Sequence, residues 1–78
     1  MKISVIGGGS AYTPGLIEGL IKIREEVPYT EICLMDIDAP KLETVGAITS
    51  KIVTLALPDV KVSTTTDRIE AIHYHIFP

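Results

Sequence analysis

Three glycines and a serine, Gly7-Gly8-Gly9-Ser10, follow a short apolar run near the start of the chain. Glycine permits a tight turn and a close approach of the main chain to a ligand. Amides at the start of a helix, together with the positive end of the helix dipole, can hold a pyrophosphate. We therefore predict that these four residues bind phosphate through backbone N–H groups, with the Ser10 hydroxyl as a further donor. The alternative is a flexible strand–helix connection without a ligand.

The glycine spacing matches the dinucleotide-binding pattern G-x-G-x-x-G at two of its three positions. Gly7 and Gly9 occupy the first two, whereas Tyr12 stands at the third and is expected to line the cofactor loop. Asp36 closes the next apolar run 24 residues after Tyr12, near the offset of about 20 expected for an acid that binds the adenosine ribose. Such a carboxylate would accept the ribose hydroxyls and repel a 2′-phosphate, which predicts NAD rather than NADP. The alternative is that Asp36 merely ends a strand.

The other reactive side chains form no recognisable catalytic or metal-binding group, and we predict neither kind of residue in the chain. Cys33 lies inside an apolar run and is expected in the core. His73 and His75 would share one face of a strand, but the further ligands that zinc needs are missing. Tyr74 has no neighbour that would tune it as an acid or base. Asp38 is expected to cap a helix rather than to contact a ligand.

The elements that must position these residues alternate apolar runs with segments of helical period. Strands are expected over residues 3–6, 31–35 and 60–65, and the alternation in the last run is typical of a half-exposed edge strand. Residues 73–78 resemble the stub of a fourth strand.

Helices are expected between these strands. Thr13 and Pro14 fit the N-cap and first residue of a helix that Pro28 ends. The second helix is expected to start near Asp38 and to continue to Pro58. Its core face is predicted from apolar residues that step by three or four: Leu42, Val45, Ile48, Ile52 and Leu55. A short third helix, capped by Asp67, would carry Ile69 and Ile72.

The order β-α-β-α-β-α predicts an α/β fold with a parallel three-stranded sheet and a possible stub of a fourth strand. We expect a three-layer α-β-α arrangement with helices on both faces, which is a partial Rossmann fold. Residues 1–78 would then form the amino-terminal half of a dinucleotide-binding domain.

Composition narrows the classes of function. The 78 residues carry a net charge of −3 and no cluster of Lys and Arg, which argues against a nucleic-acid partner. No apolar run approaches the length of a membrane span, and residues 3–6 are too short for a signal peptide. The single cysteine fits a reducing compartment, so we expect a cytoplasmic protein.

The run from Gly7 to Pro14, followed by Leu16-Ile17-Glu18-Gly19-Leu20, closely resembles the start of glycoside hydrolase family 4, in particular its 6-phospho-β-glucosidases. The similarity continues through Leu34-Met35-Asp36-Ile37 and Thr66-Asp67-Arg68 and covers most of residues 1–72. Relatives that act on α-glucosides more often carry Phe at the position of Tyr12, which favours the β-glucoside branch.

The resemblance implies a glycosidase that uses NAD and a divalent metal, commonly manganese, and cleaves 6-phospho-β-glucosides by oxidation at C3, elimination, addition of water and return of the hydride. Family members are several times longer, and their metal ligands, catalytic base and sugar-phosphate contacts lie beyond this chain. We therefore expect an NAD-binding segment that holds no metal, meets the sugar only in a full-length enzyme and is inactive alone. The alternatives are a regulatory module that binds ADP or NAD, and a structural fragment without a ligand.

An incomplete fourth strand would also leave the first strand as an unpaired apolar edge. Such an edge pairs readily with another chain, so we predict a dimer or a larger homo-oligomer.

Overall fold

The computed structural model describes residues 2–10, 12–67 and 75–77, the last of these as backbone only. Strands and helices alternate along the chain up to residue 65, as the sequence predicts. The elements are β1 (Lys2–Ile6), α1 (Thr13–Lys22), β2 (Glu31–Met35), α2 (Ala39–Ala56), β3 (Lys61–Thr65) and β4 (His75–Phe77).

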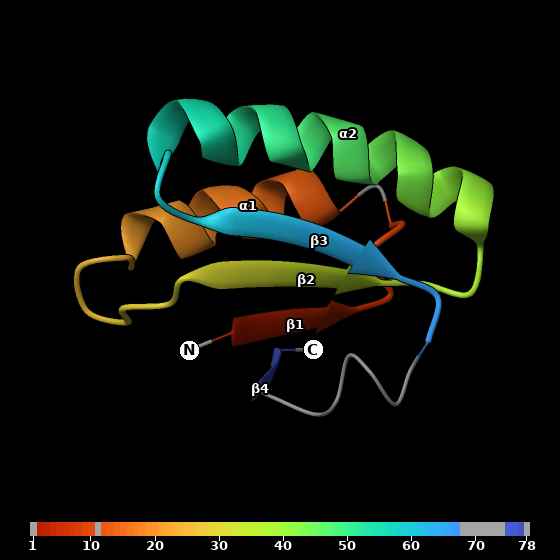
Figure 1. Cartoon of the computed structure of the whole chain (residues 1–78), viewed down its shortest axis with the longest axis horizontal. Coiled ribbons are helices and arrows are strands. Elements are labelled where there is room, and N and C mark those ends of the chain that lie inside the picture. The colour runs from red at the N-terminus through yellow and green to blue at the C-terminus, as the bar shows by residue number, and fades with distance from the viewer. Residues whose placement is uncertain (1, 11, 68–74, 78) are drawn as a thin grey trace.

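The four strands form one parallel sheet in the order β3-β2-β1-β4 (Figure 1). The register pairs Lys2 with Glu31 and Ile6 with Met35, so β1 and β2 end side by side. Because all strands run the same way, the segments that follow them meet at one edge of the sheet. The parallel α/β fold and the position of β3 as an outer strand are therefore confirmed. The glycine turn and Asp36 both lie at the carboxyl ends of the strands.

The expectation that β1 lacks a partner on its outer side is wrong. Ile3, Ser4 and Val5 pair with residues 75–77, so the stub predicted after residue 73 does form a short fourth strand. A parallel strand beside β1 satisfies the backbone groups that we expected a second copy of the chain to satisfy. The argument for a homo-oligomer therefore loses its premise, and the homo-oligomer stays a prediction without support from the sheet edge.

Both described helices cover the same face of the sheet, as Figure 1 shows for α1 and α2. Two successive crossovers in the same direction place their helices on the same side. The third helix, on which the expected second helical layer depends, falls in residues 68–74, outside the described part of the chain. Within the described ranges, neither helix combines the length and the apolarity needed to span a bilayer.

The core lies between the sheet and the two helices. Its fully buried side chains include Ile17 and Leu20 from α1, Ile32 and Leu34 from β2, and Tyr29 from the loop between them. The buried side chains Ile17 and Leu20 are three residues apart, so they lie on one face of α1. Cys33 is also buried and free, in agreement with its predicted place in the core.

The boundaries of α1 differ from the prediction. Tyr12, not Thr13, is the N-cap residue, and its side chain makes no capping hydrogen bond. The Thr13 hydroxyl instead donates to the Gly8 carbonyl at 3.1 Å, which ties the helix back to the glycine turn. The helix ends at Lys22, so Pro28 follows a separate turn rather than terminating the helix.

The core face of α2 is rotated relative to the prediction. Its buried residues are Leu42, Gly46, Thr49 and Val53, whereas Ile48 is 46% and Leu55 88% exposed. A Cβ on Gly46 would lie 2.9 Å from the Thr64 Cγ2 atom of β3. The helix therefore approaches the sheet closely at Gly46. Of the predicted core face, Leu42 is confirmed as buried and Ile52 packs partly against the core, whereas the prediction is wrong for Ile48 and Leu55.

Candidate functional site

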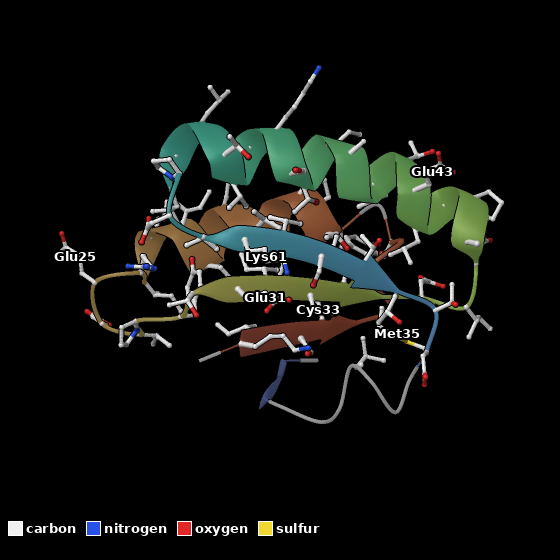
Figure 2. All side chains as sticks on the ribbon, viewed as in Figure 1. Glu25, Glu31, Cys33, Met35, Glu43 and Lys61 are labelled. Carbon is white, nitrogen blue, oxygen red and sulfur yellow. The ribbon has the colours of Figure 1, made fainter. Side chains whose placement is uncertain are left out.

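The glycine turn is fastened to the end of β2. Gly7 has a φ of +80°, a conformation that favours glycine, and it directs the chain away from β1. The amides of Gly7 and Gly8 both donate to the Met35 carbonyl at 2.8 Å. Figure 2 shows Met35 at the carboxyl end of β2, beside the turn.

Gly8 packs so closely against β2 that there is no room for a side chain. A Cβ at this position would lie 2.7 Å from the Leu34 Cβ and 3.2 Å from the Met35 amide nitrogen. A side chain would therefore push the turn off the strand. The prediction that Gly7 and Gly8 direct their amides at a phosphate is wrong, because both hydrogens face β2 instead.

The Asp36 carboxylate joins the two loops that meet at this edge. Its Oδ2 atom accepts the Gly9 amide at 3.0 Å, and its Oδ1 atom accepts the Asp38 amide at 2.9 Å. Hydrogen bonding from the Asp38 amide, with smaller contributions from Gly9 and the nearby Lys41 charge, lowers the pKa of Asp36 and outweighs partial burial. Asp36 is therefore an ionised acceptor held in a defined position.

Ser10 continues the turn into α1. Its amide donates to the Gly7 carbonyl at 3.1 Å, and its Oγ atom accepts the Tyr12 amide at 3.2 Å. Because Oγ acts there as an acceptor, its own hydrogen can still be donated to a ligand. The hydroxyl of Ser10 is thus better suited to a phosphate than its amide.

The turn, the acid and the start of α2 enclose an open hollow of about 750 Å³. It brings together four of the six predicted cofactor residues with three residues from the loop and helix that follow β2. Its lining consists of Gly7, Gly9, Ser10, Asp36, Asp38, Lys41 and Val45. Gly8 is packed against Leu34 of β2 and does not line the hollow. Tyr12 does not line it either, and 88% of its surface is exposed.

Lys41 and Val45 are the residues that sequence reasoning missed. Asp38 does cap α2, as predicted, since its Oδ1 atom accepts the Lys41 amide at 3.1 Å. A helix capped two residues after the acid presents its first turns to the acid, and Lys41 and Val45 share one helical face by their i, i+4 spacing. Counting three and seven residues from the predicted cap Asp38 would therefore have identified Lys41 and Val45 as candidate lining residues.

A smaller hollow of about 220 Å³ adjoins the first and shares Gly7 and Asp36 with it. Its other lining residues are Ile6, Met35 and Ile37, and the Ile37 side chain is 86% exposed. A hollow with charged side chains in its lining thus adjoins a hollow lined mainly by apolar residues, and the two share the Asp36 carboxylate.

The described residues include no group of three His, Cys, Asp or Glu side chains that could hold a metal ion. His73 and the side chain of His75, whose metal-binding role we considered, lie outside what the structure describes.

Comparison with known proteins places this geometry in context. The sequence profile of the family 4 glycosyl hydrolases matches residues 2–76. A 6-phospho-beta-glucosidase of Escherichia coli K12 is 39% identical over 74 residues, which are 92% of this chain and 16% of that protein.

Two solved structures superpose closely on the chain. A 6-phospho-beta glucosidase of Thermotoga maritima, solved with manganese, NAD+ and glucose-6-phosphate, has a TM-score of 0.88 at 35% identity, over 97% of this chain and 18% of that one. A 6-phospho-alpha-glucosidase from gut microorganisms, solved with NAD and glucose-6-phosphate, has a TM-score of 0.91 at 32% identity, again over 97% and 18%. The chain therefore spans about a sixth of the length of the proteins that it matches.

Proposed function

The chain belongs to family 4 of the glycosyl hydrolases, and we propose that it forms the first mononucleotide-binding half of the family's NAD-binding domain. The ADP part of NAD would occupy the hollow at the carboxyl edge of the sheet. One observation carries this proposal: a glycine turn and an ionised aspartate, 27 residues apart in sequence, are joined by a hydrogen bond at the rim of one hollow. A dinucleotide fold uses this edge for its ligand.

Asp36 is proposed to accept the hydroxyls of the adenosine ribose. Its two oxygens each accept one amide, and a carboxylate offers about four acceptor positions, so two remain for the ribose. The apolar surface of Ile37 lies beside the carboxylate and suits the flat face of an adenine.

The phosphates are proposed to contact the turn and α1. The Ser10 hydroxyl can donate to a phosphate oxygen, and the Gly9 backbone lines the same hollow although its amide already donates to Asp36. The space beside Gly9 depends on its lack of a side chain, because a Cβ there would lie 2.8 Å from the Asp36 Oδ2 atom. Tyr12 stays a predicted contact for a cofactor seated outside the hollow.

For the longer protein we propose NAD-dependent cleavage of 6-phospho-β-glucosides. Three curated 6-phospho-beta-glucosidases are 39–45% identical to the matched residues, against 32–36% for three curated phospho-alpha-glucosidases, which supports the β-linked substrate. Bound NAD would accept a hydride from the sugar and later return it. The described residues of this chain bind and orient its ADP half, and we assign the manganese and sugar-phosphate contacts to other residues. The buried free thiol of Cys33 is in keeping with a cytoplasmic location.

The proposal is tested by titrating the protein with NAD, ADP and NADP while amide NMR shifts are recorded. NAD and ADP are expected to give saturable shifts centred on Gly7 to Ser10, and NADP is expected to bind more weakly. Asp36→Ala should reduce the affinity for NAD about tenfold, because it removes a charged acceptor worth about 1.5 kcal/mol or more.

Glu43→Ala is the matched control, since Glu43 is an exposed acid on α2 whose side chain points away from the sheet in Figure 2. Its affinity for NAD should equal that of the wild type. No saturable shift with any nucleotide would indicate a structural segment without a ligand. Binding of AMP and ADP as tight as that of NAD would favour a regulatory nucleotide module.

A further inference from the structure

The hollow carries an unfavourable charge for a phosphate ligand unless one residue compensates for it. Asp36 and Asp38 contribute two carboxylates to the lining, and among the described residues Lys41 is the only cation that lines it. A diphosphate brought next to two carboxylates is repelled, and the repulsion is strongest where water is partly excluded. A ligand phosphate therefore needs the Lys41 ammonium group.

Lys41 lies where such a group is needed. Its Cβ is 3.2 Å from the position that a Cβ on Gly9 would occupy, so the lysine stem begins directly over the glycine turn. Its charge also reaches Asp36, whose pKa it helps to lower. The lysine stem thus begins beside the glycine turn, and its charge is near enough to act on Asp36.

The ammonium group of Lys41 is also weakly held. Its nearest carboxylate oxygen is the Asp38 Oδ2 atom at 4.0 Å, and 73% of the lysine side chain is exposed. An exposed pair at this distance contributes little to stability, so the side chain can move to a ligand at small cost. Lys51, ten residues and nearly three helical turns further along α2, has the same charge but lies outside the hollow.

We propose that Lys41 binds a ligand phosphate in this hollow and thereby determines which nucleotides the site accepts. The inference rests on the proposed function and adds the residue that offsets the two carboxylates. The phosphate is that of the 5′-diphosphate, because the lysine stem overlies Gly9 of the turn. A 2′-phosphate offers the same chemistry from the other side of Asp36, and the experiment separates the two.

The test titrates the wild type, Lys41→Gln and Lys51→Gln with adenosine, ADP and 2′-AMP, using amide NMR shifts to obtain dissociation constants. Glutamine keeps most of the lysine stem and removes the charge. Lys41→Gln should weaken ADP binding about three- to tenfold and leave adenosine binding within twofold of the wild type. Added salt should weaken ADP binding more for the wild type than for Lys41→Gln. Lys51→Gln should behave as the wild type.

Each other outcome has a distinct meaning. If the wild type binds ADP and Lys41→Gln loses no more affinity than Lys51→Gln, the role of Lys41 is refuted while the proposed function stands. An equal loss for adenosine and ADP also refutes it, because the lysine would then support the site without contacting phosphate. A loss confined to 2′-AMP would reassign Lys41 to a 2′-phosphate. If the wild type binds neither adenosine nor ADP, the proposed function itself fails, and this inference with it.

Discussion

The two ends of the sheet use polar groups in different ways. At the amino end, Arg24 and Asp59 form an ion pair at 2.7 Å, and the Tyr29 hydroxyl donates to the Leu20 carbonyl at 2.6 Å. At the carboxyl end, the Asp36 carboxylate accepts two amides beside an open hollow. Figure 2 marks the two ends by Glu25, in the loop after α1, and by Met35, at the end of β2.

We infer that polar groups at the amino end stabilise the fold, whereas those at the carboxyl end are available for a ligand. At the amino end, the interactions join segments of the chain to one another, and the Arg24 guanidinium lies 5.4 Å from the centre of the buried Tyr29 ring. At the carboxyl end, ionised groups face a hollow and keep acceptor and donor capacity for a ligand. The same strand–helix units therefore close the fold at one end and form the proposed nucleotide site at the other.

The strongest test of this division removes Tyr29. The side chain is fully buried, so Tyr29→Ala leaves a cavity and an unpaired Leu20 carbonyl. A loss of about 3–5 kcal/mol is expected, close to the whole stability of a domain of this size, and circular dichroism should show a largely unfolded chain. Tyr29→Phe should cost only about 1–2 kcal/mol. If Tyr29→Phe folds but changes the ADP dissociation constant more than twofold, the two ends are not independent.

Gly8→Ala tests whether the carboxyl end also contains a structural element. Its new methyl group would press on Leu34 and on the backbone of β2, so a loss of about 2 kcal/mol in the free energy of unfolding is expected, with weaker ADP binding. Gly19→Ala is the matched control, because nothing lies within 4 Å of a Cβ there, and it should gain about 0.5–1 kcal/mol. Urea unfolding measures both, and changes of the same sign would contradict the packing argument.

Much of the fold could be predicted because local patterns and topology agree. Short β-branched runs alternate with helix-period segments, and parallel strands require crossovers of one hand. Asp38 could be assigned as a cap and Cys33 as a core residue because both follow from local sequence alone.

What could not be predicted depends on contacts between distant segments. The buried face of α2 follows from the closeness of Gly46 to β3, and the pairing of β4 with β1 follows from the shape of the sheet. The same reason explains the amides of the glycine turn. Their acceptors, Met35 and Asp36, lie 27 or 28 residues away along the chain, and only the folded structure shows that the turn is anchored to them.

The two ends should also respond to opposite extremes of pH. The pKa of Asp36 is lowered, chiefly by the Asp38 amide, so its stabilising effect is present above its ordinary value of 3.8 and is lost as the pH falls below it. Burial raises the pKa of Tyr29 above its ordinary value of 10.0, so folding is weakened as the pH rises beyond 10.0. Urea midpoints across this range should show a smaller acid loss in Asp36→Asn and a smaller alkaline loss in Tyr29→Phe. A smaller alkaline loss in Asp36→Asn, or a smaller acid loss in Tyr29→Phe, would contradict the assignment of the two pH effects to these residues.

The smallest expected effect compares the two ion pairs directly. A double-mutant cycle with Arg24→Gln and Asp59→Asn should give a coupling energy of about 0.5–1 kcal/mol, because the charges are 2.7 Å apart and Arg24 is only 23% exposed. The cycle with Lys41→Gln and Asp38→Asn should give a value near zero, because that pair is 4.0 Å apart and Lys41 is 73% exposed. Saturating ADP should leave the first coupling unchanged, whereas it should increase the loss caused by Lys41→Gln, because only the folded protein binds the ligand. Equal coupling energies in the two cycles would mean that Lys41 already stabilises the fold through its ion pair with Asp38. Its ammonium group would then not be available to a ligand at small cost.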